Sequence, residues 1–170
     1  MRRVVVTGLG VVSPVGVGVP ATWESIIAGR SGIGPITAFD VSAYPTRFAG
    51  YIDGWDPTPW IEAKEARRMA RFQQFAVASA LMAVEDSGLV IDESNAERVG
   101  VIVGSGIGGL QTMEEQKEVL DEKGPGRVSP FLVPMMIVDL AAGHISIRFG
   151  AKGINYAPVS ACATGNHSVG

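Results

Sequence analysis

The chain of 170 residues is 46% hydrophobic and 18% charged, a composition that fits one globular unit with a sizeable core and argues against a disordered chain. A formal net charge of −3 at pH 7 gives no general attraction to nucleic acid or to anionic membranes, so neither is expected as a partner. One cysteine and two histidines exclude an intramolecular disulfide and a structural zinc site, and no metal is expected.

The N-terminal segment begins with a β-branched run. Residues 3–7 predict a short buried strand, which is followed by a turn that ends at Ser13-Pro14. This segment lacks the apolar stretch and cleavage site of a signal peptide, and no apolar run in the chain approaches the roughly 18 residues of a membrane span. We therefore expect a cytoplasmic protein.

Two helices are predicted on either side of a long surface segment. Thr22 is expected to cap a short helix that stops at Gly29, and residues 31–59 are rich in glycine, proline and aromatic residues without a sustained period. Apolar residues then recur at a spacing of three or four between residues 61 and 87, which predicts a helix with Gly88 as its C-cap.

The second half of the chain alternates strands and helices. A buried strand at 99–103 leads into a glycine-rich turn and a helix at about 110–123, and Pro134 is placed in the first turn of a helix that runs to Gly150. A last strand at about 154–159 leads to Cys162 and to a helix that starts near Ala163. This alternation predicts an α/β fold with a largely parallel sheet, and the short final helix suggests that the sequence ends in mid-domain.

The turn from Gly104 to Gly109 matches the spacing G-x-G-x-x-G between a strand and a helix. A dinucleotide site would need a second strand that ends in an acidic residue about 20 positions later, and the sequence offers none there. We therefore interpret these glycines, and those at Gly8 and Gly10, as positions where the backbone packs closely on a neighbouring element.

Cys162 is the candidate nucleophile. A lone cysteine is usually a buried small hydrophobe, but a position at the start of a helix exposes the sulfur to free N–H groups and favours the thiolate. His167 is rotated off the thiol's face of that helix, so it is a doubtful general base. His144 is interpreted as a hydrogen-bonded core residue.

A basic stripe is predicted on the helix that starts near residue 61. Lys64, Arg67, Arg68 and Arg71 are spaced i, i+3, i+4 and i+7 and therefore share one face. Such a stripe is either a solvated face or a docking surface for an anionic partner, and the spacing does not decide between them.

Four motifs occur in order along the chain: VVVTGLG at 4–10 with Ser13-Pro14 and Gly16, GSGIGG at 104–109, Ser129-Pro130-Phe131 with Pro134, and SACATG at 160–165. Together they resemble the elongating β-ketoacyl-acyl carrier protein synthases of bacterial fatty acid synthesis. The resemblance implies a thiolase-like fold, of which residues 1–170 are the N-terminal portion and the C-terminal half is absent. It also implies a homodimer of the full-length protein.

The same resemblance implies the chemistry. Cys162 would accept an acyl group from the phosphopantetheine of an acyl carrier protein, so no resident cofactor is expected, and a decarboxylating Claisen condensation with malonyl-carrier protein would follow. Ile107 would line the acyl pocket, and residues 131–136 would form its floor and a dimer contact. Lys64, Arg67, Arg68 and Arg127 would dock the acidic carrier protein. Two histidines and a lysine of the missing half would support condensation, so this chain alone is expected to be inactive.

Two alternatives remain open from the sequence. The chain is either a catalytic part of a fatty acid synthase or a non-catalytic piece that binds a carrier or dimerises. The second alternative is a ketosynthase of a polyketide system, which would share the chemistry and differ in its acyl groups and carriers.

Overall fold

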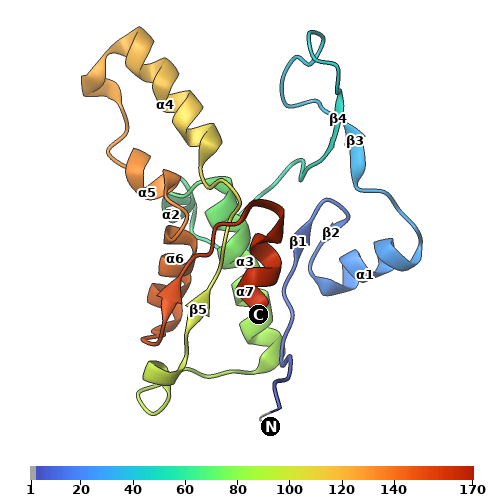
Figure 1. The fold of residues 1–170 in the computed structure, drawn as a ribbon, viewed down its shortest axis with the longest axis vertical. Helices are drawn as coiled ribbons and strands as arrows, with labels where there is room; N and C mark the ends of the chain where they lie inside the picture. Colours follow the sequence, from blue (N-terminus) through green and yellow to red (C-terminus); the bar gives the residue numbers. More distant parts are fainter. Residues whose placement is uncertain (1–2) are drawn as a thin grey trace.

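A computed structural model describes residues 3–170 of the chain (Figure 1). Its strands are β1 (Val12–Ser13), β2 (Gly16–Val17), β3 (Ile33–Pro35), β4 (Phe48–Gly50), β5 (Val101–Ile102) and β6 (Asn155–Tyr156). Its α-helices are α1 (Val19–Ile27), α2 (Ala63–Ala66), α3 (Arg71–Ser87), α4 (Leu110–Lys123), α5 (Leu132–Met136), α6 (Leu140–Phe149) and α7 (Thr164–Val169). Short 3-10 turns are η1 (Ala96–Arg98), η2 (Pro125–Arg127) and η3 (Ala161–Ala163). The fold is therefore mixed α/β, as predicted.

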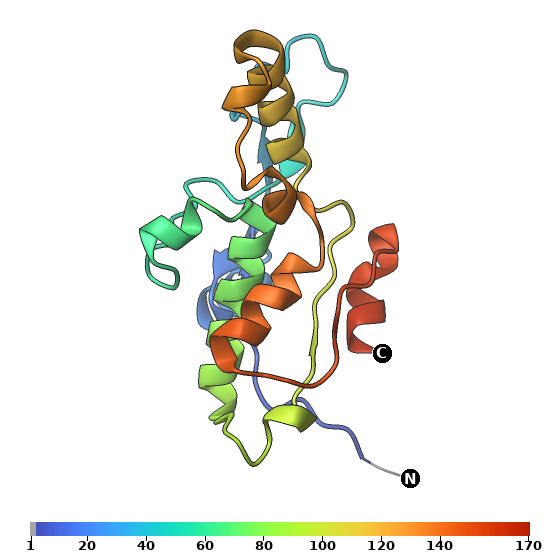
Figure 2. The ribbon, with the colours of Figure 1, turned by 90° about the vertical axis from the view of Figure 1, so that its left-hand side faces the viewer.

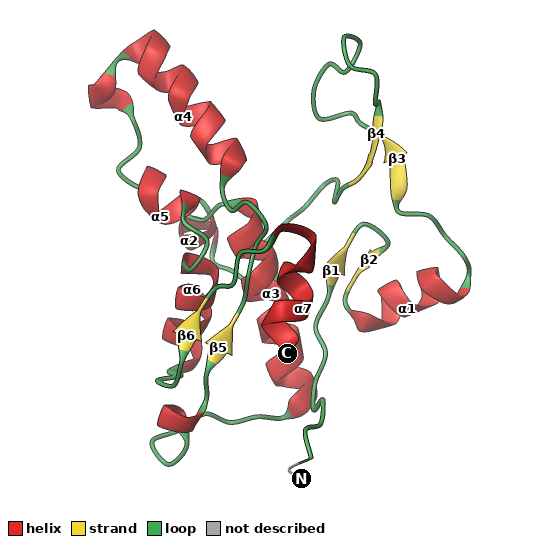
Figure 3. Ribbon diagram, viewed as in Figure 1, coloured by secondary structure: helices red, strands yellow, loops and turns green. Residues whose placement is uncertain are grey.

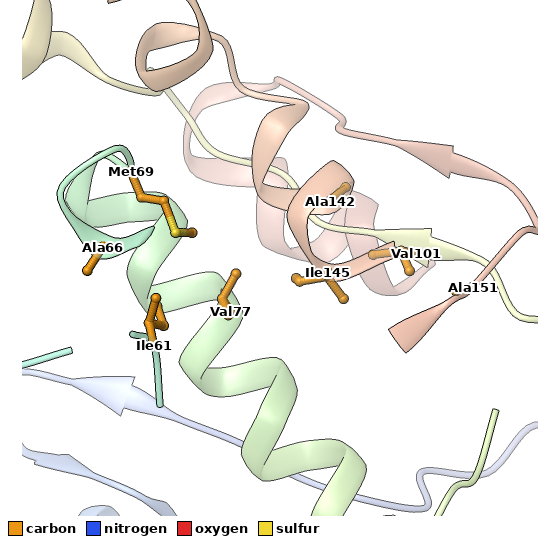
Figure 4. Close-up of a cluster of buried hydrophobic side chains, with 8 residues drawn as sticks. All are labelled: Ile61, Ala66, Met69, Val77, Val101, Ala142, Ile145 and Ala151. Carbon is orange, nitrogen blue, oxygen red and sulfur yellow. The ribbon is translucent and has the colours of Figure 1, made fainter. Parts of the chain in front are cut away.

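The hydrophobic core lies where α3 and α6 pack together and against β5 (Figure 4). Val77 of α3, Ile145 of α6 and Val101 of β5 are all buried there. Ile61 and Met69, on either side of α2, close the same cluster. The apolar spacing that predicted a helix over 61–87 thus marks the face that the protein buries.

The strands of residues 3–170 form three separate two-stranded sheets, which corrects the prediction of one large parallel sheet (Figure 3). β5 and β6 are the parallel pair, with Val101 opposite Asn155 and Ile102 opposite Tyr156. α6 contacts both strands, and Figure 2 shows α3 and α6 on one side of the β5 segment and α7 on the other. Helices thus lie on both sides of a parallel strand pair, as predicted, but the pair has only two strands.

The predicted N-terminal strand is wrong for this structure. Within the described chain, residues 3–11 form no strand, and Val4, Val5 and Val6 are exposed. A β-branched run becomes a strand only when a neighbouring strand accepts its hydrogen bonds, because strand propensity depends on pairing and burial. The excursion at 31–59 is on the surface as predicted, and it carries the antiparallel hairpin β3–β4, with Ile33 opposite Gly50.

The glycines near the N-terminus allow the close packing that the sequence predicts. A Cβ atom at Gly8 would lie 2.2 Å from the carbonyl oxygen of Ala83, and one at Gly10 would lie 1.9 Å from that of Ser79. Both carbonyls belong to α3. The segment therefore lies directly on the backbone of α3, where a side chain would not fit.

The helix predicted over 61–87 is broken between α2 and α3. Ala70 is extended, and its N–H donates to Oε1 of Gln73 instead of to a helix carbonyl. The side chain of Gln74 donates to the carbonyl oxygens of Ala66 and Met69, which a continuous helix would pair with backbone N–H groups further along the chain. The break is therefore built from side-chain hydrogen bonds. Gly88 caps α3 in the left-handed conformation, as predicted.

The helix predicted to run to Gly150 is also two helices. α5 ends because Ile137 is extended, and the N–H of Gly109 donates to the carbonyl of Met136 at 3.1 Å. Pro134 lies early in α5, where its missing N–H costs little. At the N-terminal end of the chain, α1 begins at Val19, so Thr22 lies inside α1 and is not its cap. Among residues 3–170 no helix is long and apolar enough to cross a membrane.

Candidate active site

Two loops that follow the parallel strands meet beside Cys162. The loop after β5 contains Gly104, and the loop after β6 leads through Pro158 to Cys162. A Cβ atom at Gly104 would lie 2.4 Å from the carbonyl oxygen of Pro158 and 2.4 Å from Cγ2 of Thr164. Parallel strands bring their carboxyl-terminal loops to one edge of a sheet, and here that edge presents the cysteine.

The glycine-rich loop packs against protein on both of its sides. One side contacts the cysteine loop, since a Cβ at Gly106 would lie 3.6 Å from the carbonyl oxygen of Ala161. On the other side, a Cβ at Gly109 would lie 2.3 Å from the carbonyl oxygen of Met135 in α5. Gly108 adopts φ 83°, which side chains disfavour. The close-packing interpretation of these glycines is confirmed.

Cys162 lies in the middle of the η3 turn and is exposed. Its neighbour Ala161 adopts φ 49°, the one positive value at a non-glycine position in the described residues, and such a conformation is strained for alanine. The helix that follows, α7, has only six residues and begins after Cys162, so it offers less of a helix terminus than the sequence suggested.

The side chains around the turn are held by hydrogen bonds that sequence reasoning missed. The N–H of Ser160 donates to Oγ1 of the buried Thr164 at 2.9 Å, and Oγ of Ser160 shares a hydrogen bond with Nδ1 of His167 at 2.7 Å. These contacts tie the start of the turn to α7. His167 is therefore engaged with Ser160, in agreement with the doubt that it serves as the base for Cys162.

The predicted pocket residue Ile107 is 71% exposed at the tip of the glycine-rich loop. It follows Gly106, which contacts the cysteine turn, so Ile107 lies on the same edge of the molecule as Cys162. Its role in an acyl pocket remains a prediction.

Of the basic residues predicted to share one helix face, Lys64, Arg67 and Arg68 lie in or just after α2, and the break at Ala70 separates them from Arg71, which begins α3. Lys64 and Arg68 line one cleft of about 510 Å³, and the Arg68 guanidinium lies 4.7 Å from the ring centre of Phe131. Arg67 faces a second cleft, of about 440 Å³. Arg127 lies in η2 at the far end of α4 from α2, so the structure does not bring it to the other three (Figure 1).

Arg71 is exposed, but its guanidinium is engaged in contacts with other residues. Its guanidinium donates to the carbonyl of Ile52 and lies 5.4 Å from the ring centre of Phe75. It therefore links the start of α3 to the surface segment that precedes α2.

His144 differs from the expected hydrogen-bonded core residue. Nε2 of His144 is buried and, in the part of the chain that the structure describes, has no hydrogen-bond partner. Burial lowers the pKa of this imidazole below its ordinary value of 6.5, while the Glu65 carboxylate opposes the shift and the Arg148 guanidinium adds to it. Glu65 and Arg148 pair with each other at 2.8 Å and join α2 to α6.

We expect His144 to make the protein less stable in mild acid. The pKa of His144 is lower in the folded protein than in the unfolded chain, so the unfolded chain binds this proton more readily. The contribution of His144 to the free energy of unfolding is therefore present above pH 6.5 and is lost as the pH falls below that value. The variant His144→Gln should lose less free energy of unfolding than the wild type between pH 7.5 and 5.5 in urea titrations. Equal slopes for His144→Gln and the wild type would contradict this expectation.

The described residues contain no group of three or more His, Cys, Asp or Glu side chains placed to hold a metal ion.

Comparison with known proteins decides the family. Residues 1–170 match the family described as "Beta-ketoacyl synthase, N-terminal domain". The chain belongs to the β-ketoacyl synthase family. The predicted resemblance is thereby confirmed, and the "3-oxoacyl-[acyl-carrier-protein] synthase 2" of Synechocystis is one of the similar curated proteins. That relative is 48% identical over 169 residues, which are 99% of this chain and 41% of the relative.

Solved β-ketoacyl synthase structures agree with this fold. "The ishigamide ketosynthase/chain length factor" is 35% identical, with a TM-score of 0.86 over 99% of this chain and 42% of that one. A type II polyketide ketosynthase, in a complex with its acyl-carrier protein, is 22% identical with a TM-score of 0.76, and the match covers 100% of this chain and 45% of that chain. The chain spans about two fifths of the length of the Synechocystis relative.

Proposed function

We propose that the protein is an elongating 3-oxoacyl-acyl carrier protein synthase of fatty acid synthesis and that Cys162 is its acyl-accepting nucleophile. The observation that carries the proposal is the exposed Cys162 on a strained turn, at the edge where the loops of the parallel pair meet. The 48% identity to a synthase of this activity supports the choice of reaction.

The first step follows from the exposed thiol. The sulfur of Cys162, as the thiolate, attacks the thioester carbonyl of an acyl-carrier protein, and the bond from that carbonyl to the phosphopantetheine sulfur breaks. The phosphopantetheine leaves as a thiolate and takes up a proton, and the acyl group remains on Cys162. The hydrogen bonds of Ser160 to Thr164 and His167 hold the turn in place during this exchange. Ile107, on the same edge, is proposed to line the acyl pocket.

The second step joins two acyl groups. Malonyl-carrier protein loses CO₂, and the resulting carbanion attacks the thioester of Cys162, which releases the cysteine thiolate and a β-ketoacyl-carrier protein. We assign the groups that support decarboxylation to the remainder of a full-length synthase, of which residues 1–170 would be the N-terminal portion of a thiolase-like domain. The full-length protein is proposed to act as a homodimer, and residues 1–170 alone are not expected to turn over.

The test is the intact mass of the full-length protein after incubation with an acyl-carrier protein thioester. We expect a mass gain of one acyl group, located on Cys162 by peptide mapping. The same incubation of residues 1–170 alone is the comparison and should give little adduct. Acylation at another residue, or none in a folded full-length protein that binds the carrier, would contradict the proposal and favour a non-catalytic carrier-binding role.

Carrier docking is proposed for Lys64, Arg67, Arg68 and Arg127. Lys64, Arg67 and Arg68 are exposed near one another around α2, and a fold-related ketosynthase is found in a complex with its acyl-carrier protein. Arg127 projects from the end of α4, so it would contact a different part of the carrier.

We expect the double variant Arg67→Glu/Arg68→Glu to raise KM for the acyl-carrier protein by about 10-fold or more, because charge reversal turns attraction to an acidic partner into repulsion. The kcat should change little, and the effect should shrink as salt is added. Arg98→Glu/Lys152→Glu, at the exposed arginine of η1 and the exposed lysine after α6, makes the same change of net charge and is the matched control. An equal effect of this control would show that only net charge matters.

A polyketide ketosynthase remains the second candidate, favoured by the 35% identity to the ishigamide ketosynthase. Side-by-side assays of the full-length protein with carriers from fatty acid and polyketide systems separate the two. A higher kcat/KM with the fatty acid carrier supports the first proposal, and the reverse order supports the second.

A further inference from the structure

We infer that Gln74 is a positioning residue for carrier binding: its side-chain amide fixes the elbow, residues 67–70 between α2 and α3, that presents Arg67 and Arg68. The inference rests on the carrier docking proposed above. Gln74 would act through the backbone that carries the two arginines, and not by binding the carrier itself.

The side-chain amide of Gln74 is hydrogen-bonded to the backbone on both sides of Arg67 and Arg68. Its Nε2 donates to the carbonyl of Ala66 at 2.9 Å and to the carbonyl of Met69 at 3.1 Å. Arg67 and Arg68 are the two residues between these carbonyls. Figure 4 shows Ala66 and Met69 at the two ends of this elbow, beside α3. One side chain therefore holds the backbone on each side of the two arginines.

The orientation of the Gln74 amide is itself fixed. Its Oε1 accepts a hydrogen bond from Nε1 of Trp55 at 2.8 Å, and an indole N–H can only donate. The nitrogen of the amide must therefore face the two carbonyls of the elbow. Trp55 is held in turn by stacking on Trp60, with ring centres 5.4 Å apart, and by an edge contact with Phe75 at 5.0 Å.

This arrangement matters for docking because the backbone of the elbow sets where the two arginine side chains start. Arg67 and Arg68 are exposed and neither is in an ion pair within the described residues, so their positions depend on the backbone that carries them. Gln74, Trp55 and Arg67 line the same cleft of about 440 Å³. A loosened elbow would leave both arginines charged and present but would spread them over more orientations, at an entropic cost on binding.

The experiment measures binding of labelled holo-acyl carrier protein to full-length variants at several salt concentrations. Gln74→Met keeps nearly the same length and shape and removes all three hydrogen bonds. Trp55→Phe is milder, because it keeps an aromatic ring and, of the three hydrogen bonds, removes one, the bond to Oε1 of Gln74. Gln111→Met is the matched control, since Gln111 is exposed on α4 and bonds to Glu115 of the same helix.

We expect Gln74→Met to raise Kd for the carrier by about 5-fold to 10-fold and Trp55→Phe by about 2-fold to 3-fold, with a less steep dependence of log Kd on log salt than in the wild type. The rate of Cys162 alkylation by iodoacetamide should stay within about 2-fold of the wild type, because the cysteine turn lies on other elements. Gln111→Met should match the wild type in each measurement. If Gln74→Met does not fold, Trp55→Phe carries the test.

The outcomes separate this inference from the proposed function. A wild-type protein that fails to bind the carrier overturns the proposed docking and this inference with it. A wild type that binds, with variants of equal affinity and equal salt dependence, overturns the role of Gln74 alone. A loss of affinity with an unchanged salt dependence and slower Cys162 alkylation also overturns it, because that pattern indicates general damage to the fold.

Discussion

The variant Cys162→Ser of the full-length protein is expected to lose at least about 10³-fold in kcat/KM for acyl transfer from the carrier. A cysteine at neutral pH is present in part as a thiolate, whereas a serine hydroxyl stays protonated and is a weak nucleophile without an adjacent base. His167, the histidine that follows Cys162 on α7, is bonded to Ser160 instead. A steady-state assay with a radiolabelled acyl-carrier protein measures the loss.

Carrier binding is the control for this variant. The oxygen of serine is smaller than sulfur, and Cys162 is exposed, so Kd for the carrier should remain within about 2-fold of the wild type. Loss of both binding and transfer would indicate a distorted turn. Full transfer activity in Cys162→Ser would show that another residue is the nucleophile.

Features with a local cause could be predicted from the sequence. The helix at 110–123 was predicted with its observed bounds, because glycines flank a run of helix-forming residues. The close packing of Gly8 and Gly104 was also predicted, since glycine in an otherwise apolar strand or turn indicates a nearby backbone.

Features with a distant cause could not be predicted. The break at the elbow depends on Gln74, a residue whose type is compatible with a helix and whose hydrogen bonds are set by the fold. The end of α5 depends on the N–H of Gly109, far away in the sequence. The extent of the sheet depends on which strands pair, and a β-branched run such as residues 3–7 does not contain that information.

The same division applies to the candidate site. The turn between a strand and a helix indicated Cys162, and the resemblance to the synthases gave it a role. The bond between Ser160 and His167 was missed because it crosses from the start of the turn to α7, a geometry that helical spacing does not describe. The basic stripe was predicted as one helix face, and the break at Ala70 separates Arg71 from Lys64, Arg67 and Arg68.

The variant Gly104→Ala is expected to destabilise the protein by about 2–3 kcal/mol and to slow acylation of Cys162 by about 10-fold to 100-fold. The added Cβ would lie 2.4 Å from the carbonyl oxygen of Pro158 and from Cγ2 of the buried Thr164. Backbone and a β-branched side chain cannot yield easily, so the two loops must separate. Thr164 holds Ser160 at the start of the turn, and its displacement moves Cys162.

A matched substitution isolates this effect. A Cβ atom at Gly126 would have no atom within 4 Å, and this glycine has no positive φ. Gly126→Ala therefore adds the same methyl group at a position where it meets no neighbour. We expect Gly126→Ala to keep the wild-type midpoint in urea and the wild-type acylation rate, while Gly104→Ala loses both. Loss of stability with an unchanged acylation rate would mean that the contact between the loops supports the fold without setting the position of Cys162. Wild-type behaviour of Gly104→Ala in both measurements would show that the two loops are not in contact at this glycine.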